Sequence, residues 1–287
     1  MVARAKKVRP TGRSVKASDS SSEWSIPGPE EFTQPSDDFF DYYTLFHGTA
    51  GVGKSSLIAS IPGSLIFQFE PARRNIKARQ IDFRISTVPD MERCAENAWK
   101  KFIALLEQAE SDKSIKVIGI DNINECYKAC ERNWCLVNNM EFVPKKDYGA
   151  SRNEINSEFT SVFNNLKFDS RLGVIFTAHT KEREGELNTG TTDNVYSPAC
   201  NTSVFDWLKV AMDFAFFIGH HNKSRAVHCR WDTIWTKCGL PNRFCNLKGV
   251  PLNGFSLPND PTKGYETLIR AWDNKIKNGI FLEETEE

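Results

Sequence analysis

The fold of this chain is decided by the stretch Leu45-Phe46-His47-Gly48-Thr49-Ala50-Gly51-Val52-Gly53-Lys54-Ser55-Ser56-Leu57. It has the form of a P-loop, the glycine-rich turn that joins a strand to a helix and holds the phosphates of a nucleotide. Residues 42–47 favour a strand and residues 55–60 can begin a helix, so the glycines have the flanks that the motif needs. The sequence therefore predicts a nucleoside triphosphate site.

The residues of this loop have separate expected roles. Gly48, Gly51 and Gly53 let the main chain wrap so that successive N–H groups point at the phosphates, beside the positive end of the helix dipole. Lys54 is expected to reach the β- and γ-phosphates, and Ser55 to supply a hydroxyl for Mg²⁺. The predicted nucleotide-binding set is Gly48, Thr49, Ala50, Gly51, Val52, Gly53, Lys54, Ser55 and Ser56.

The composition indicates a globular protein with no overall charge. Of the 287 residues, 40% are hydrophobic, and the formal net charge is zero, so no global basic field indicates a nucleic-acid partner. No apolar run approaches the roughly 18 residues of a membrane span, and no signal-peptide core follows Met1. We therefore expect a soluble, cytoplasmic protein that is not secreted and has no membrane partner.

The cysteines lack the paired spacing of a zinc site. All 8 are scattered along the chain without a C-x-x-C pair. Reduced thiols of an intracellular protein are the expected interpretation. A metal site made of His228, Cys229, Cys238 and Cys245 stays an open alternative.

The chain is expected to have three parts. Residues 1–35 are poor in apolar side chains and rich in Ser, Pro, Lys and Arg, which predicts a disordered arm. Every charged residue before Asp19 is basic, so the arm could touch nucleic-acid phosphates, although a transit peptide or a solvated tail has a similar composition. Residues 36–240 hold the predicted core, and residues 241–287 a C-terminal extension of the same domain with an acidic tail.

Apolar runs alternate with helical periods from residue 41 onward, which is typical of a parallel sheet with crossover helices. Helical spacing of apolar residues marks helix faces at 95–106 and 155–166, and a short helix is expected at 267–272. The predicted class is α/β, with a mostly parallel central sheet flanked by helices. Strands are expected at 42–47, 64–69, 115–120, 172–178, 214–218 and 226–235.

Acidic residues near two strand ends are candidates for the chemistry of hydrolysis. Asp121 ends the apolar run 115–120 and is expected to bind Mg²⁺ together with Ser55. Many P-loop ATPases have a water-orienting glutamate directly after this aspartate, but here Asn122 follows it. Glu70, at the end of the strand 64–69, and Glu125 are the two alternatives, unless Glu70 simply pairs with Arg73 or Arg74.

His179 ends the buried strand expected at 172–178 and can donate a hydrogen bond to a γ-phosphate. The residues that follow, 180–201, are polar and contain Gly185 and Gly190, and we expect a long functional loop there. Together they suggest a switch in which His179 senses phosphate and the loop responds. An ordinary strand-end histidine is the alternative.

These strand ends, in this order, resemble those of the RecA-type ATPases, and the short core looks most like the phage RecA-like single-strand annealing or recombination ATPases. The matching residues are 48–55, Glu70 in Phe69-Glu70-Pro71, Asp121 in Ile120-Asp121-Asn122 and His179 in Ala178-His179-Thr180. The resemblance implies a RecA-like fold and an ATP hydrolase with Lys54, Glu70 and His179 as catalytic residues. Glu70 takes the role of the base, and His179 stands where RecA proteins have a glutamine sensor.

The same resemblance implies partners and an assembly. Loop 180–201 would contact single-stranded DNA, and loop 140–150, with Lys145 and Lys146, would be a second DNA-facing loop. The implied assembly is a homo-oligomer with ATP at or near the subunit interface, where Lys237 would act on the site of the neighbouring subunit. A phage origin, and hence the cytoplasm of a bacterium or of a virus-infected cell, is the implied location.

Other classes of P-loop protein remain as alternatives. A P-loop NTPase that assembles or remodels protein without DNA fits the zero net charge equally well. A small-molecule kinase would need an arginine-rich lid, and only Lys181 and Arg183 follow the sensor strand closely. A GTPase is disfavoured because the chain has no N-K-x-D sequence.

Overall fold

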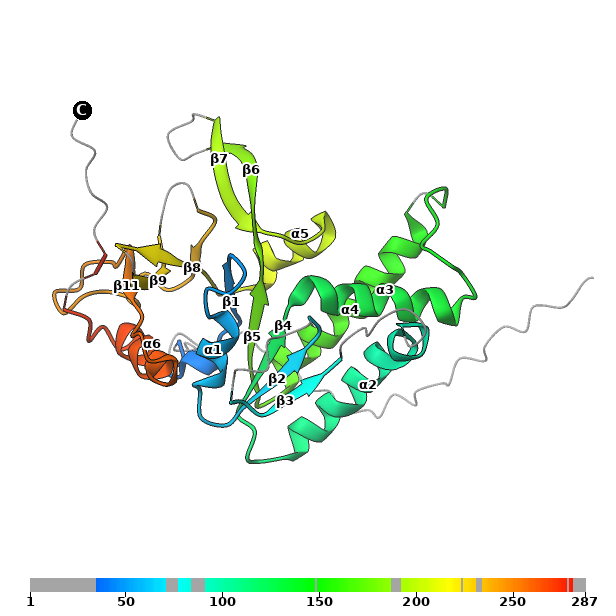
Figure 1. Cartoon of the computed structure of the whole chain (residues 1–287), viewed down its shortest axis with the longest axis horizontal. Coiled ribbons are helices and arrows are strands. Elements are labelled where there is room, and N and C mark those ends of the chain that lie inside the picture. Colours follow the sequence, from blue (N-terminus) through cyan, green and yellow to red (C-terminus); the bar gives the residue numbers. More distant parts are fainter. Residues whose placement is uncertain are drawn as a thin grey trace, which may run out of the picture. The chain divides into compact units, whose positions relative to one another are not determined.

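The P-loop strand β1 (Thr44–Gly48) runs through the middle of the central sheet in this computed structural model of the protein (Figure 1). The structure describes residues 35–70, 77–83, 91–147, 149–186, 192–222, 224–230, 234–277 and 279–280. Apart from Pro35, the expected N-terminal arm lies outside these residues, as does the expected acidic tail.

The described part of the chain forms a nine-stranded sheet in the order β11-β9-β8-β1-β5-β4-β2-β3, with β10 beside β8. Neighbours from β8 to β3 pair in parallel, whereas β9, β10 and β11 pair antiparallel. The predicted α/β class with a mostly parallel sheet is confirmed. The other strands of this sheet are β2 (Ser64–Gln68), β3 (Gln80–Asp82), β4 (Val117–Asp121), β5 (Gly173–Ala178), β8 (Phe214–His221), β9 (Ser224–His228), β10 (Lys237–Cys238) and β11 (Gly254–Ser256).

Helices cover both faces of the sheet. α1 (Lys54–Ala59) and α6 (Gly264–Trp272) pack with Phe46 and Ile66 on one face, and Leu45 and Phe67 face a second core on the other. Successive strand residues alternate between these cores because their side chains point to opposite faces. This second core is built with α2 (Met91–Ser111), α3 (Ile123–Val137), α4 (Ala150–Asp169) and α5 (Thr202–Ala211), and two 3-10 turns, η1 (Phe39–Asp41) and η2 (Pro261–Lys263), complete the helical elements of the described residues.

The continuous apolar runs of the sequence are explained by this double covering. Every residue of β1, β2, β4 and β5 is buried, so these strands have no polar face to show an alternating pattern. The strand expected at 226–235 is shorter than predicted. β9 ends at His228 because the N–H groups of Cys229 and Arg230 turn to the carbonyl oxygen of Asn253, at 2.7 and 3.1 Å.

The prediction of a loop over 180–201 is wrong. These residues form a β-hairpin of β6 (Thr180–Glu186) and β7 (Thr192–Pro198), joined by residues 187–191, which lie outside the described residues. Its base is closed by a hydrogen bond from the N–H of Ala199 to the carbonyl oxygen of His179 at 2.7 Å. The hairpin carries polar side chains on most positions, so its sequence has no apolar alternation, although its main chain pairs fully.

The C-terminal residues take part in the same sheet and core. β11 pairs antiparallel with β9, and Trp272 of α6 packs in the core around Phe214 and Phe216. The short helix expected at 267–272 is present and begins at Gly264.

No helix among the described ranges has both the length and the apolar composition needed to cross a bilayer. Within those same ranges, no three His, Cys, Asp or Glu side chains lie together as a metal site would require. The cysteine cluster that the sequence left open, with Cys229 and Cys238, therefore does not gather around a metal position.

Candidate active site

The P-loop main chain follows directly from its glycines. A Cβ at Gly48 would lie 2.2 Å from the carbonyl oxygen of Ile218, so glycine lets β1 and β8 approach closely. Gly53 has a φ of 95°, in the left-handed region that favours glycine, and precedes α1. The loop therefore needs glycine at these two positions for different reasons.

Lys54 is folded back over the loop. Its Nζ donates hydrogen bonds to the carbonyl oxygens of Gly48 at 2.9 Å and Thr49 at 2.8 Å. Burial lowers the pKa of Lys54, and the negative charges of Asp121 and Glu70 oppose this shift. The ammonium group is thus held in the loop with the two carboxylates close enough to act on it.

Asp121 connects three elements at the carboxyl edge of the sheet. Its Oδ2 accepts a hydrogen bond from Ser55 Oγ of α1, and its Oδ1 accepts one from Thr177 Oγ1 of β5, both at 2.5 Å. The carboxylate is buried, and its neighbours are hydroxyl groups, so the donors are the hard oxygen ligands that Mg²⁺ prefers. Ser55 and Asp121, the predicted metal ligands, are therefore in contact. Thr177 was missed by sequence reasoning, although it is the polar residue in an otherwise apolar run.

Glu70 lies at the centre of a second group of side chains. Its Oε1 accepts a hydrogen bond from His179 Nε2 at 2.7 Å, and its Oε2 accepts one from Asn122 Nδ2 at 2.6 Å. These three residues follow β2, β5 and β4, which are adjacent in the sheet, so their ends meet at one edge. The hydrogen bond from His179 is the main reason that the pKa of Glu70 is lowered. Glu70 is therefore a carboxylate at neutral pH.

The side-chain amide of Asn122 makes two hydrogen bonds, one through its oxygen and one through its nitrogen. Its Oδ1 accepts a hydrogen bond from the N–H of Glu125 at 3.0 Å and so caps α3. Its Nδ2 donates to Glu70. Asn122 thus fixes the orientation of Glu70. From the sequence it was noted only because it stands where many P-loop ATPases have a glutamate.

The charged groups of two other predicted residues have partners outside this group. The carboxylate of Glu125 forms an ion pair with Lys128 on the same helix, with Oε1 and Nζ 2.6 Å apart. Lys237 donates from Nζ to the carbonyl oxygen of Lys209 at 3.0 Å. The structure therefore brings Glu70, rather than Glu125, to His179.

His47 joins the P-loop strand to the hairpin. It is completely buried, its Nε2 lies 2.7 Å from the carbonyl oxygen of Trp235, and its Nδ1 lies 3.0 Å from Thr180 Oγ1. Desolvation lowers the pKa of His47 to about 4, so the ring is neutral near pH 7. Because a carbonyl oxygen can only accept, Nε2 carries the proton and Nδ1 accepts from Thr180. Nothing in the sequence distinguished this histidine from an ordinary core residue.

Two further segments extend beyond the sheet. The β6–β7 hairpin projects away from the sheet in Figure 1 and begins at Thr180, next to His179. The segment between α3 and α4, which contains Lys145 and Lys146, is irregular as expected, and both lysines are exposed. Phe142 in the same segment is 69% exposed.

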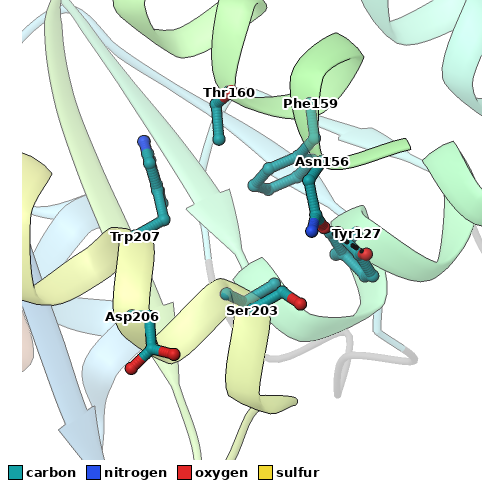
Figure 2. A pocket seen from close by; sticks show the side chains of 8 residues that line it. Tyr127, Asn156, Phe159, Thr160, Ser203, Asp206 and Trp207 are labelled. Carbon is teal, nitrogen blue, oxygen red and sulfur yellow. Dashed lines mark hydrogen bonds between the residues drawn. The ribbon is translucent and has the colours of Figure 1, made fainter. Parts of the chain in front are cut away.

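A separate pocket of about 270 Å³ lies among α3, α4 and α5 (Figure 2). Tyr127 donates from its hydroxyl to Oδ1 of Asn156 at 2.6 Å within it. None of the predicted site residues lines this pocket, and Asp206 is the charged residue of its lining. It therefore lacks the positive charge that phosphate binding requires.

The chain is similar to a known protein family. A protein-family model described as an AAA domain matches residues 42–238. The matched range is more than half of the chain and contains the P-loop, Glu70, Asp121 and His179. No curated protein matches the chain.

Proposed function

Because the chain belongs to the AAA-domain family of P-loop NTPases, we propose that it binds ATP with Mg²⁺, hydrolyses it, and uses it to act on single-stranded DNA. The biological setting that we propose is recombination, annealing or repair, in line with the resemblance to phage RecA-like proteins. The acting form would be a homo-oligomer with ATP at or near the subunit interface.

The observation that carries this proposal is the ionised Glu70, which is held by Asn122 and His179 beside Lys54. Hydrolysis needs a group that orients the attacking water, and a carboxylate with two fixed hydrogen bonds has a defined direction. The lowered pKa of Glu70 makes it a weak proton acceptor, so orientation of water is its main expected contribution.

Lys54, Ser55 and Asp121 would bind different parts of a triphosphate and its metal ion. Lys54 can turn from the carbonyl oxygens of Gly48 and Thr49 to the β- and γ-phosphates, which are stronger acceptors. Ser55 and Asp121 would hold Mg²⁺. That ion, when bound, neutralises charge on the phosphate oxygens.

The contacts of His179 and His47 support a coupling between ATP and the hairpin. His179 contacts Glu70 and is followed directly by β6, while His47, the residue before Gly48, contacts Thr180 at the start of β6. A change at the γ-phosphate can thus reach the hairpin through His179 and through His47. If the hairpin binds DNA, ATP and DNA should each raise the affinity for the other by the same factor, typically about 5- to 150-fold.

One observation favours the alternative, an NTPase that remodels protein without DNA. The hairpin sequence contains Lys181 and Arg183 but also four acids, Glu182, Glu184, Glu186 and Asp193. An acidic hairpin is a poor ligand for the phosphates of DNA. Under the first hypothesis, DNA binding would then rely on Lys145, Lys146 and the basic residues of 1–35.

The test is the ATPase rate of the full chain with and without single-stranded DNA, for the wild type and Glu70→Gln. Glutamine keeps the size of Glu70 but lacks its charge, so we expect retained ATP binding and hydrolysis lowered roughly a hundredfold or more. Glu125→Gln is the matched control and should leave hydrolysis near the wild-type rate. The opposite pattern would reject Glu70 as the water-orienting residue.

DNA affinity is measured in the same proteins at low and high salt, with ATP, with ADP and without nucleotide. His179→Ala should keep nucleotide binding and lose the dependence of DNA binding on ATP. DNA binding that is immeasurable in every nucleotide state at low salt would reject the DNA hypothesis in favour of protein remodelling.

A further inference from the structure

Arg225 reaches the P-loop from the side opposite Glu70. A Cβ at Gly53 would lie 2.2 Å from Arg225 Nη1, so the guanidinium is in contact with the P-loop main chain at the residue before Lys54. The sheet register explains this position. Gly48 pairs with Ile218, Ile218 pairs with Val227, and Arg225 therefore lies at the same edge of the sheet as the loop.

The guanidinium has little to neutralise it. Its Nη2 donates to the carbonyl oxygen of Pro258 at 2.8 Å. Among the residues that the structure describes, no carboxylate lies within ion-pair distance of Arg225, whereas Arg79, Arg152 and Arg243 each have one. Arg225 is half-buried, and the nearest charged residue along the loop is Lys54, which has the same sign. A cation in this position is stabilised by an anion at the loop.

The order of the strands indicates which part of a nucleotide would meet Arg225. Glu70, Asn122 and His179 follow β2, β4 and β5, which lie on one side of β1 in the sheet. Arg225 belongs to β9, which lies on the other side of β1 beyond β8. The γ-phosphate, where hydrolysis occurs, belongs beside Glu70. The opposite flank then receives the α- and β-phosphates and the nucleoside.

We propose that Arg225 binds the α- and β-phosphates of the nucleotide within its own chain. This inference rests on the proposed ATP site and adds a residue to it that is about 170 positions away from the P-loop in the sequence. A guanidinium is suited to the role because its planar set of N–H groups can donate two parallel hydrogen bonds to phosphate oxygens. ATP and ADP share these two phosphates, so Arg225 should bind them equally well.

The experiment measures ATP and ADP binding to the full chain by calorimetry in the presence of Mg²⁺. Arg225→Gln removes the charge but keeps a planar amide with N–H donors, and Arg225→Lys keeps the charge but not the planar fork. Hydrogen bonds to charged groups have a strength that corresponds to about a ten- to hundredfold change in affinity. We expect Arg225→Gln to lower the affinity for ATP and the affinity for ADP by the same factor in this range. Arg225→Lys should have a smaller loss of affinity.

The matched control is Lys248→Gln, which removes one positive charge from an exposed turn between Cys245 and Pro251. It should bind both nucleotides as the wild type does. Thermal unfolding without nucleotide should give the same Tm for Arg225→Gln and the wild type. A lowered Tm in both Arg225 variants, with equal losses of affinity, would instead assign Arg225 a structural role at Pro258.

Other outcomes separate this inference from the proposed function. If Lys54→Ala loses nucleotide binding but Arg225→Gln does not, the ATP site stands and the role of Arg225 is rejected. If Arg225→Gln loses ATP binding but binds ADP as the wild type does, Arg225 contacts the γ-phosphate and its assignment to the α- and β-phosphates is wrong. If the wild type and Lys54→Ala bind ATP equally, the proposed ATP site itself is wrong.

Discussion

Asn122 offers the sharpest test of how the candidate site is built, because its two contacts can be removed separately. Asn122→Asp keeps an oxygen to cap α3, and Asp and Asn are equally good N-cap residues, so the cap itself is retained. The same substitution replaces the Nδ2 donor to Glu70 by a carboxylate. The variant therefore alters Glu70 without removing the cap.

The size of the effect follows from the contact that is lost. A hydrogen bond to a charged group contributes about 1.5–3 kcal/mol. The side chain of Glu70 is 35% exposed and keeps the hydrogen bond from His179, so we take the lower end. This corresponds to roughly a tenfold lower kcat, since each 1.4 kcal/mol is a factor of ten in rate.

The pH profile gives the sign of the electrostatic effect. Hydrogen bonds from His179 and Asn122 lower the pKa of Glu70, and a second carboxylate beside it raises that pKa. Because Glu70 must be ionised, the acid limb of kcat should move to higher pH in Asn122→Asp. ATPase rates at saturating ATP across pH 4.5–8 measure both changes.

Asn122→Ala is the control for the cap. It lacks both contacts and should lose about 1 kcal/mol of stability, hence a few degrees of Tm, in addition to the lower kcat. A wild-type kcat and pH profile in Asn122→Asp, with only a lower Tm in Asn122→Ala, would show that Asn122 is a helix cap and does not hold Glu70 for hydrolysis.

The remaining predictions concern single residues of the same edge. Lys54→Ala removes the ammonium group of the P-loop and should abolish hydrolysis with a large loss of nucleotide affinity; near-normal turnover would contradict the P-loop assignment. Asp121→Ala should weaken ATP binding only when Mg²⁺ is present, and an equal loss with a chelator would exclude a role through the metal. His47 has a folded-state pKa of about 4, below its unfolded value near 6.5, so it contributes stability above pH 6.5 that is lost as pH falls toward 4. Denaturant unfolding at pH 7 and pH 5 measures this loss. From pH 7 to pH 5 the free energy of unfolding should fall by about 2 kcal/mol less in His47→Gln than in the wild type, and an identical pH dependence would reject this account.

The sequence by itself determined the P-loop, the strands around it and the α/β class. The P-loop depends on local glycine geometry and on residues that are neighbours in the chain, so its form is visible without the fold. The strands 64–69, 115–120 and 172–178 were visible because both faces are buried, which requires continuous apolar runs. The polar hairpin β6–β7 was mistaken for a loop because hydrogen bonds between main-chain groups do not produce a hydrophobic pattern in the sequence.

Only the tertiary structure decided which strand ends meet. The order β9-β8-β1-β5-β4-β2 brings Glu70 to Asn122 and His179, pairs Thr177 with Asp121, and carries Arg225 to Gly53. The sequence left Glu70 and Glu125 as alternatives because each lies near the end of a strand or the start of a helix. The order of strands is set by long-range packing of their two apolar faces, and no local pattern encodes it.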